Sequence, residues 1–395
     1  AAPGFACGED VEDGVFQFRM NNITTQGQLD LSKKRRVPRD YRNLDRLFLE
    51  RGDVLFNATN SPDLVGKTAF FEGLEEPATF SNHFLRLRPR QQQLDGRFLN
   101  RWLNVQFQQG RFKGMCRQWV NQATVGRDAL LAMQIPLPPL PEQRRIAAIL
   151  DKADELRAKR RSALAKLDSL TQSIFLDMFG DPATNPKGWD LVPLGEISEV
   201  QGGLQLSSTR NSLPRKVPYL RVANVYRGRL DLREVKTLHA TESEVARTAL
   251  TKDDFLVVEG HGNPEEIGRG ALWDGSIAQC VHQNHLIRVR FDSRRIMPLY
   301  ASAYLNSSGG RRHLLRSGKT TSGLNTINVS QVRATPIAVP PVDFQHRYCR
   351  HILNIEHMRA SYTAALFKLE SLFASLQHRA FQGELISESR CEFRQ

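Results

Sequence analysis

The chain has 395 residues, enough for two or three domains with cores of their own. Hydrophobic residues make up 40% and charged residues 25%, which excludes a disordered chain, and no run approaches the roughly 18 apolar residues of a membrane span. The formal charge of +13 favours a polyanionic partner; nucleic acid, a membrane surface and no polyanion at all stay open on charge alone.

The cysteines and the first residues indicate a reducing compartment. The opening "AAPGFACGED" has no basic region followed by an apolar core, so no secretory signal is visible. The chain has five cysteines, an odd number that cannot all pair in disulfides, and they lie far apart without a C-x-x-C pair. We therefore expect reduced thiols in the cytoplasm and no zinc site. They are Cys7, Cys116, Cys280, Cys349 and Cys391.

In chain order, the predicted elements form two similar halves. Residues 1–135 contain short strand patterns such as "DVLFNA" and "HFLRLR" between Gly, Pro and Asn turns, and residues 136–182 join a proline string to a long helix. Residues 183–337 repeat the strand patterns as "FLVVE" and "HLIRVRF", and residues 338–383 repeat the proline string and the helix. Residues 384–395 form a C-terminal tail.

Matching segments lie at one constant offset, which predicts a tandem repeat with a period of about 202 residues. "NHFLRLR" at 82–88 matches "NHLIRVR" at 284–290, and "PLPPLPEQ" at 136–143 answers "AVPPVDFQ" at 338–345. Ordered matches at one offset along the whole chain indicate a duplication. The fold class is therefore α/β (α+β), with two globular units that alternate with two long helices.

Each long helix carries an apolar stripe with coiled-coil spacing. Such extended runs without Gly or Pro are long for a globular helix, and the stripe must be buried against another helix. We expect the two helices to pair antiparallel, with a globular unit at each end; ordinary core helices inside one large domain are the alternative. The pairing residues would be Ile149, Ala153, Leu156, Ala163, Leu167, Leu170 and Ile174, with Ile355, Met358, Tyr362, Leu369, Leu372 and Leu376.

These features resemble the specificity (S) subunit of type I restriction-modification systems. The resemblance rests on "IPLPPLPEQRRIAAILDKAD" leading into the long helix, on "FRMNNITTQGQLDL" at 18–31, and on "GWDLVPLGEISEVQGG" at 188–203. It implies two target recognition domains, residues 1–135 and 183–337, each of which reads one half of a split DNA sequence. It also implies that the long helices form an antiparallel coiled coil that sets the spacing between the half-sites.

The same resemblance implies partners and a location in the cytoplasm of a prokaryote. The helices would dock two methyltransferase (modification) subunits, and the full complex would add restriction motor-nuclease subunits. S-adenosylmethionine, ATP and Mg²⁺ would be bound by those partners, so we expect no cofactor, no metal and no membrane contact for this chain. Two departures stand out: residues 1–135 lack a counterpart of "GWDLVPLGEIS", and Asp343 and Phe344 replace the Pro-Glu of the first string, which leaves symmetrical docking open.

No motif of a catalytic site is present. An amino-methyltransferase needs [NDS]-P-P-[YF], but Pro-Pro occurs only inside the proline strings. A PD…ExK nuclease would need a Lys where Leu74 stands, and "EGHGNPEEIGRG" lacks the Lys and Ser/Thr of a phosphate-binding loop. We therefore predict a non-catalytic chain with no catalytic residues.

Polar and basic loops are the candidates for DNA contact, because Arg, Lys, Asn, Gln, Ser and Thr read base edges or bind phosphates. The segments are 31–42, 56–67 with its counterpart 258–269, and 113–127 with its counterpart 316–330. A solvated loop is the alternative for 31–42, and a structural loop before the following helix is the alternative for 316–330. Arg221 recurs as Arg19, which indicates a shared phosphate or structural role. The candidates are Lys33, Lys34, Arg35, Arg36, Asn57, Thr59, Asn60, Ser61, Lys67, Asn121, Gln122, Arg221, His261, Asn263, Arg269, Lys319, Thr320, Thr321 and Asn325.

The leading hypothesis is a DNA sequence-reading subunit that also holds its partners together. The alternative is a duplicated coiled-coil scaffold that binds proteins without reading DNA. The dependence of DNA affinity on salt separates them, because phosphate contacts make affinity fall steeply as salt rises.

Overall fold

The computed structural model describes residues 1–41, 44–118, 122–321 and 324–385. The described residues form two compact units: the first holds those within 1–162 and 364–385, and the second holds those within 163–363. Each unit thus contains one β-rich part, one half of the first long helix and one half of the second.

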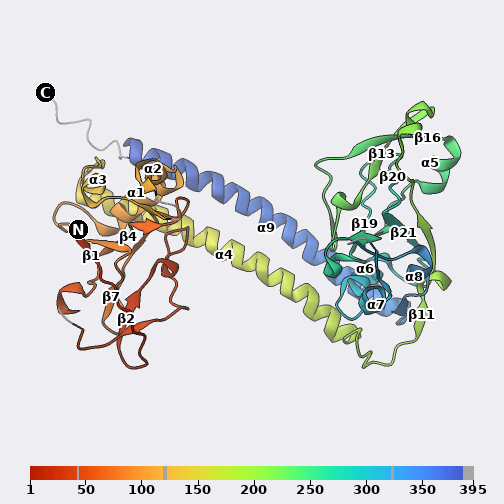
Figure 1. The fold of residues 1–395 in the computed structure, drawn as a ribbon, viewed down its shortest axis with the longest axis horizontal. Coiled ribbons are helices and arrows are strands. Elements are labelled where there is room, and N and C mark those ends of the chain that lie inside the picture. The colour runs from red at the N-terminus through yellow and green to blue at the C-terminus, as the bar shows by residue number, and fades with distance from the viewer. Residues whose placement is uncertain (42–43, 119–121, 322–323, 386–395) are drawn as a thin grey trace. The chain divides into compact units, whose positions relative to one another are not determined.

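The first unit is built on three small sheets (Figure 1). One has the order β1-β8-β4-β6, the second β3-β2-β7 and the third β5-β10-β9. The strands are β1 Ala2–Pro3, β2 Val15–Phe18, β3 Arg36–Val37, β4 Val54–Asn57, β5 Thr59–Asn60, β6 Thr68–Phe70, β7 Ala78–Phe80, β8 Phe84–Leu87, β9 Arg117–Gln118 and β10 Ala123–Thr124. The helices are η1 Met20–Asn22, η2 Leu44–Leu47, α1 Gly96–Gln108, α2 Arg111–Met115 and α3 Arg127–Leu131.

The second unit repeats these sheets in the same strand order, as β12-β21-β17-β19, β16-β13-β20 and β18-β23-β22, with two further pairs, β11-β24 and β14-β15. Its strands are β11 Leu191–Pro193, β12 Ser198–Gly202, β13 Arg215–Leu220, β14 Val225–Tyr226, β15 Arg229–Leu230, β16 Lys236–Ala240, β17 Phe255–Val258, β18 Gly260–His261, β19 Gly270–Leu272, β20 Val281–His282, β21 Leu286–Phe291, β22 Lys319–Thr321, β23 Leu324–Thr326 and β24 Pro336–Ala338. Its helices are η3 Leu194–Glu196, η4 Ser208–Ser212, η5 Val222–Asn224, α5 Glu242–Thr248, η6 Pro264–Glu266, α6 Pro298–Asn306, α7 Arg312–Ser317 and α8 Val329–Arg333.

The register of the strands confirms the tandem repeat. In both units the second sheet contains one parallel pair, which aligns Phe18 with Phe80 in β2-β7 and Leu220 with His282 in β13-β20. The two partners in one unit are related to those in the other by the constant offset that the sequence shows. The strands β2, β4 and β17 are buried on both faces, because each is covered by other elements on both sides of its sheet.

The two long helices are α4, Leu140–Phe179, and α9, Val342–Gln382, which begin and end inside the predicted segments 136–182 and 338–383. In the first unit the start of α4 packs on the end of α9, where Leu150 and Phe373 share a buried cluster. In the second unit the end of α4 packs on the start of α9, where Phe179 lies 5.3 Å from Tyr348. The helices therefore run antiparallel, as predicted (Figure 1).

Interhelical ion pairs reinforce both contacts. Arg161 donates to Glu370 at 2.7 Å in the first unit, and Arg359 lies 2.5 Å from Asp168 in the second. Both pairs are partly exposed, so each contributes at most about 1 kcal/mol. Apolar burial is the larger contribution.

The buried stripe differs from the predicted one at four positions. Leu156 and Leu170 of α4 are each 43% exposed, and Met358 and Leu372 of α9 are 38% and 51% exposed. The reason is visible at residue 157, next to Leu156: the Arg157 guanidinium lies 4.1 Å from the centre of the Phe373 ring and covers the apolar seam itself. A stripe with a strict 3.5-residue repeat drifts by about 20° per heptad on a 3.6-residue helix, so some of its positions leave the buried face.

The other predicted pairing residues lie at or near the seam. Ala153, Leu167 and Ile355 are buried. The remaining six are partly buried: Ile149, Ala163, Ile174, Tyr362, Leu369 and Leu376.

Phe344, which departs from the Pro-Glu pattern, has a packing role in the second unit. Its ring lies 6.0 Å from both Phe179 and Trp189. Trp189 belongs to the "GWDLVPLGEIS" segment. Phe344 therefore packs on the end of α4 and on the segment that follows it.

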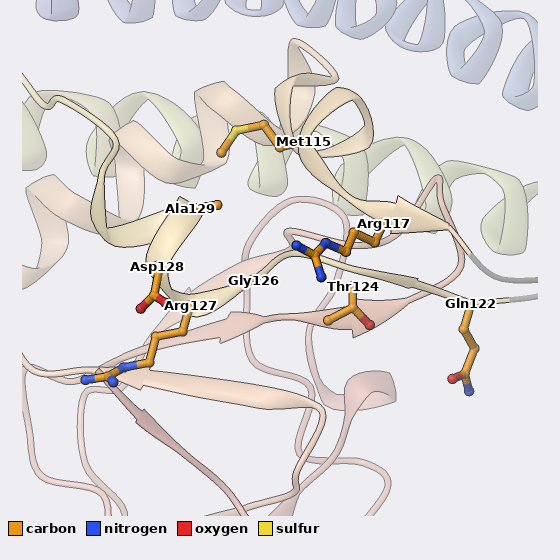
Figure 2. Close-up of a pocket in the computed structure, with 8 residues that line it drawn as sticks. All are labelled: Met115, Arg117, Gln122, Thr124, Gly126, Arg127, Asp128 and Ala129. Atoms are coloured by element: carbon orange, nitrogen blue, oxygen red, sulfur yellow. The ribbon is translucent and has the colours of Figure 1, made fainter.

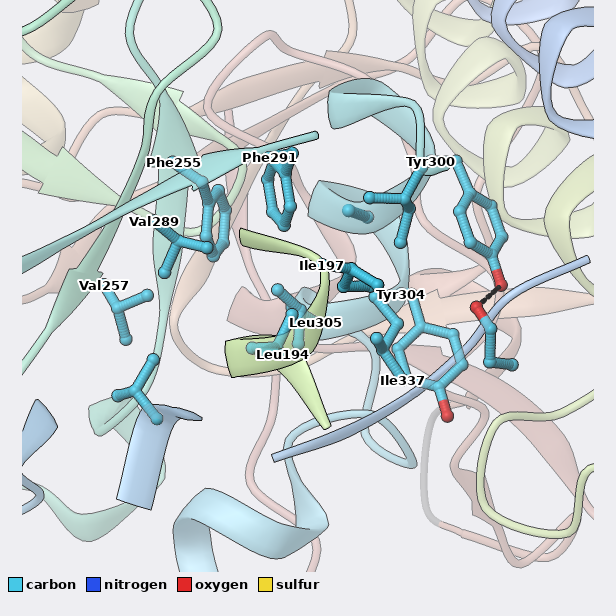
Figure 3. Packing of buried hydrophobic residues seen from close by; sticks show 14 of the residues in the cluster. Leu194, Ile197, Phe255, Val257, Val289, Phe291, Tyr300, Tyr304, Leu305 and Ile337 are labelled. Carbon is cyan, nitrogen blue, oxygen red and sulfur yellow. Dashed lines mark hydrogen bonds between the residues drawn. The ribbon is translucent and has the colours of Figure 1, made fainter. Parts of the chain in front are cut away.

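The core of the second unit joins its β-rich part to both long helices. The buried cluster contains Phe255 and Val289 of the sheet, Tyr300 of α6, and residues from α4 and α9 (Figure 3). The Tyr300 hydroxyl donates a 3.0 Å hydrogen bond to the Ala338 carbonyl of β24, drawn as the dashed line (Figure 3). Among the described residues, no helix is both long and apolar enough to cross a membrane.

Candidate nucleic-acid interface

A small three-stranded sheet in each unit brings two of the predicted DNA-contact segments together. In the first unit β10 pairs with β5 and with β9, which joins segment 56–67 to segment 113–127. In the second unit β23 pairs with β18 and β22, which joins 258–269 to 316–330. The sheet order is the same in both units, whereas the loop sequences differ.

One glycine closes the polar loop at the same place in both copies. Gly66 has φ +94° and Gly268 has φ +69°, a left-handed conformation that side chains with a Cβ rarely adopt. A Cβ on Gly66 would lie 2.3 Å from Phe112, and one on Gly268 would lie 2.8 Å from Leu314. The repeated "VGK" and "IGR" motifs thus hold the loop ends against the domain core.

Most polar side chains of the first loop bond to the loop itself. Asn57 is fully buried, donates to the carbonyls of Thr59 and His83, and accepts a 2.6 Å bond from the Asn60 amide. This predicted DNA contact is therefore part of the loop's support. The Thr59 hydroxyl lies 3.2 Å from that of Thr124. Ser61 is half-buried and donates its backbone N–H to the Asn60 side chain.

The second loop presents a different set of side chains. His261 is half-buried and its Nδ1 accepts a hydrogen bond from the backbone of exposed Asn263, whose side chain caps the short helix η6. Beneath them, Glu259 lies 3.3 Å from His285. Burial raises the pKa of Glu259, and the neighbouring His285 opposes that shift. This pair was missed from the sequence, although "VEGH" and "QNH" placed acid and imidazole next to a polar loop.

The cations at the ends of these loops are structural. Lys67 is 6% exposed, and its Nζ donates to the carbonyls of Met20 and Ile23 at 3.0 and 2.6 Å. Burial lowers the Lys67 pKa. Arg269 is 7% exposed and bonds to Glu266 at 2.7 Å. Neither predicted contact has its charge free for phosphate, because burial and these bonds already occupy it.

A surface hollow of about 700 Å³ adjoins the small sheet of the first unit. Figure 2 shows Arg117 and Thr124 on neighbouring strands, with Arg127 and Asp128 where α3 begins. Gln122, a predicted contact, is exposed at its edge. Arg117 and Arg127 were not among the predicted contacts, although both lie inside segment 113–127, because an isolated arginine in a sequence looks the same whether or not it borders a hollow.

Several candidates lie where side chains are not described. Asn121 falls outside the described residues. Lys319, Thr320 and Thr321 form β22, and Asn325 lies on β23 opposite Thr320. Their backbone positions place them on the small sheet beside the polar loop of the second unit.

The basic run 33–36 leads into β3, which belongs to a different sheet. Arg35 donates to the carbonyls of Cys7 and Glu9, and Arg36 forms an ion pair with Glu76. These two predicted contacts are therefore used to hold the β2-β3 region. Lys33 and Lys34 are exposed.

Arg221 begins the turn that recurs at Arg19. In both copies the buried asparagine three residues later, Asn22 or Asn224, accepts a bond from the arginine backbone and donates two bonds to the following hairpin. The Arg221 side chain lies 2.8 Å from Glu234. The recurrence thus has a structural cause: one asparagine side chain ties the turn to the hairpin.

Three comparisons with known proteins all match this chain to specificity proteins of type I restriction systems. A family model described as the type I restriction modification DNA specificity domain matches residues 21–166. The type I restriction enzyme EcoKI specificity subunit of Escherichia coli K12 is 25% identical over 406 residues, which cover 96% of this chain and 84% of the relative. The StySPI specificity subunit of Salmonella potsdam is 24% identical over 394 residues, which cover 95% of this chain and 83% of the relative.

A solved structure shares the fold. The crystal structure of the type I restriction-modification system S subunit from M. genitalium superposes with a TM-score of 0.54 at 15% identity, covering 96% of this chain and 92% of that chain. Two β-rich domains that alternate with two long paired helices are therefore the architecture of the chain, as predicted.

Proposed function

Because the chain is similar to specificity subunits of type I restriction enzymes along almost its whole length, we propose that it belongs to their family, reads a bipartite DNA sequence and sets the distance between the two halves. Residues 1–135 would read one half-site and residues 183–337 the other, on double-stranded DNA in a prokaryotic cytoplasm. The relatives are specificity subunits, the non-catalytic components of such systems, so the prediction that this chain is not an enzyme is confirmed.

The observation that carries this proposal is the matched pair of small sheets. Both units place a glycine-closed polar loop beside the segment that precedes α3 or α8, in the same strand order. The scaffold is common, whereas the side chains on it differ: Ser61 and Gln122 in one copy, His261 and Asn263 in the other. Two domains that read different DNA sequences need the same backbone scaffold but different polar side chains at its exposed end.

The long helices also carry apolar side chains suited to partner docking. Leu353 and Phe367 of α9 are 61% and 72% exposed, and Leu156, Leu170 and Leu176 of α4 are exposed as well. Large apolar groups on an otherwise charged helix surface mark protein interfaces. We propose that they receive the methyltransferase subunits, two in number, to which restriction subunits would be added.

The test is the methylation pattern produced by the chain with its modification subunits. Modified bases would be mapped by sequencing DNA from cells that express the wild type, Ser61→Ala with Gln122→Ala, or His261→Ala with Asn263→Ala. The first pair should relax only one half of the methylated motif, and the second pair only the other half. Gln172→Ala, an exposed glutamine on α4, is the matched control and should leave the motif unchanged.

The alternative, a protein scaffold without sequence reading, predicts a different result. Binding of the purified complex to a duplex with the mapped motif should weaken steeply as salt rises, and a scrambled duplex should bind far more weakly. Sequence-blind binding, or one pair of variants changing both half-sites, would overturn the assignment of one reader to each half-site.

A further inference from the structure

The same buried glutamine lies one turn inside each long helix. Gln143 and Gln345 are both fully buried, and each is the fourth residue of its helix. They are related by the repeat offset and stand at the end of "PPLPEQ" and "PPVDFQ". A fully buried amide needs hydrogen-bond partners for its oxygen and its NH₂ group. Those partners identify the segments that each glutamine holds in place.

In the first unit, Gln143 joins three backbone segments. Its Oε1 accepts a 2.8 Å bond from the N–H of Asp95, the residue that caps α1. Its Nε2 donates to the carbonyl of Gln93 at 2.9 Å and to that of Pro138 at 2.8 Å. One side chain thereby ties the start of α4 to the loop before α1 and to the proline string.

In the second unit, Gln345 makes the same three bonds at the equivalent positions. Its Oε1 accepts a 2.7 Å bond from the N–H of Met297, which caps α6. Its Nε2 donates to the carbonyls of Arg295 at 3.2 Å and Pro340 at 2.8 Å. Every partner is related to its counterpart in the first unit by the repeat offset, although the partner side chains differ.

The ring contact between the domain helix and the end of a long helix also recurs, as Phe98 with Phe381 and as Tyr300 with Phe179, but the ionic contacts at the two joints differ. In the first unit, Arg101 of α1 bonds to Asp151 and Asp154 of α4, an ionic contact. In the second unit Ala303 and Leu353 stand at the positions of Arg101 and Asp151, so this ion pair has no equivalent there. The residues next to the glutamine also differ, Pro-Glu in one string and Asp-Phe in the other. The glutamine is therefore the polar contact that both joints have in common.

Hydrogen bonds and apolar packing constrain such a joint differently. Rings and partly exposed ion pairs tolerate small rotations, whereas an amide that makes three directional bonds loses them when its angle changes. The relative position of the two half-sites on DNA depends steeply on the spacer length. Each added base pair shifts one half-site by about 3.4 Å and rotates it by about 34°. A fixed angle between domain and helix is what makes one spacing acceptable and its neighbours unacceptable.

Provided that the chain reads a bipartite site as proposed above, we propose that Gln143 and Gln345 are positioning residues that lock each recognition domain to its long helix and so enforce one spacer length. They act through the backbone of α1 and α6 and touch no base. Loss of either amide frees one joint, and loss of both frees both. The half-site loops, which the glutamines do not contact, keep their base preferences.

The experiment measures binding of the complete chain with its modification subunits to a set of DNA duplexes. The duplexes carry the mapped half-sites at the native spacing and at spacings one and two base pairs shorter or longer, with a further set that has one base changed in a half-site. For the wild type, a one-base-pair change in spacing should weaken binding by about tenfold or more, the scale of a mismatched site. In Gln143→Met with Gln345→Met that ratio should fall severalfold, while the ratio for the changed base stays the same.

Two control variants separate positioning from general loss of stability. Gln172→Met makes the same chemical change on an exposed face of α4 and should keep the wild-type spacing ratio. Leu49→Ala removes a buried side chain of the first domain outside the joint, and should weaken binding at every spacing by the same factor. Gln143→Met alone frees one joint and leaves the other intact, so it should give an intermediate ratio and serves if the double variant does not fold.

The outcomes are distinct. A folded double variant, or Gln143→Met alone in its place, that retains the full spacing ratio overturns the role of the glutamines. A variant that loses base discrimination together with spacing discrimination shows a general structural role and overturns it as well. A wild type that binds all duplexes alike refutes the bipartite reading itself, before any variant is compared.

Discussion

The aromatic residue at the end of each long helix gives a sharp prediction about stability. Phe179 ends α4 in the second unit and Phe381 lies at the equivalent place near the end of α9 in the first. Phe179 is 3% exposed, with its ring 4.6 Å from Tyr300 and 5.3 Å from Tyr348. Phe381 is only partly buried and lies 5.4 Å from Phe98. The two equivalent side chains therefore contribute unequally.

The magnitude follows from burial. Truncation of a fully buried Phe costs about 3–5 kcal/mol, and the aromatic contacts place Phe179→Ala near the top of that range, at about 4 kcal/mol. Phe381→Ala removes less buried area and should cost about 2 kcal/mol. For units of this size, about 4 kcal/mol corresponds to a Tm lower by roughly 8–16 °C.

The assay is thermal unfolding of the full chain combined with hydrogen exchange read by mass spectrometry. Phe179→Ala should speed exchange in β11 and β24 of the second unit, and Phe381→Ala should speed exchange in α1 of the first. Leu176→Ala, a 42% exposed neighbour on α4, is the control and should change neither. Equal losses of stability for the two variants would refute the reasoning from burial. It would also be refuted if Phe179→Ala sped hydrogen exchange more in the first unit than in the second.

Three further outcomes are expected. His282 is buried, and its pKa is lowered to about 4 by burial and by nearby Arg288, so the stability of the second unit should be intact above pH 6.5 and fall by about 3 kcal/mol as pH drops toward 4. Urea unfolding midpoints should show this loss in the wild type. They should not show it in His282→Phe, which introduces the residue type that the first unit has at the equivalent position, Phe80. Lys67→Met leaves two carbonyls without their donor and should lower the unfolding free energy of the first unit by about 2 kcal/mol in urea titrations, and no loss would show that the buried ammonium is dispensable. Phe367→Ser should leave the Tm unchanged but reduce co-purification of the methyltransferase subunits, and undiminished co-purification would remove this face from the proposed docking surface.

Sequence patterns predicted the repeat, the two long helices and the family. The constant offset survives in the strand pairs Phe18–Phe80 and Leu220–His282, because duplicated halves keep the same register. The helices were predictable because long runs without Gly or Pro, entered through a proline string, have few other structures available. Part of the candidate interface was predictable as well: segments 56–67 and 113–127 do meet on one sheet.

Individual side-chain roles within those segments were less predictable. Asn57 and Lys67 are of the residue types that contact DNA but are buried in loop support. Whether a polar side chain faces solvent or bonds inward depends on carbonyls such as that of Met20, 47 residues away from Lys67, and no local pattern encodes such a partner. The missed Glu259–His285 pair likewise forms between residues that flank the paired strands β17 and β21, which meet only on folding.

By itself, therefore, the sequence determined the number of copies, the order of elements and the existence of the rods, since these follow from local propensity and from internal comparison. Only the tertiary structure decided which helix face is buried, because Arg157 rather than Leu156 covers Phe373. It likewise decided that the last residue of "PPLPEQ" is the one that ties helix to domain. The bonds of Gln143 reach residues up to 50 positions earlier in the chain, so its role exists only where the folded backbone brings those groups within hydrogen-bonding distance.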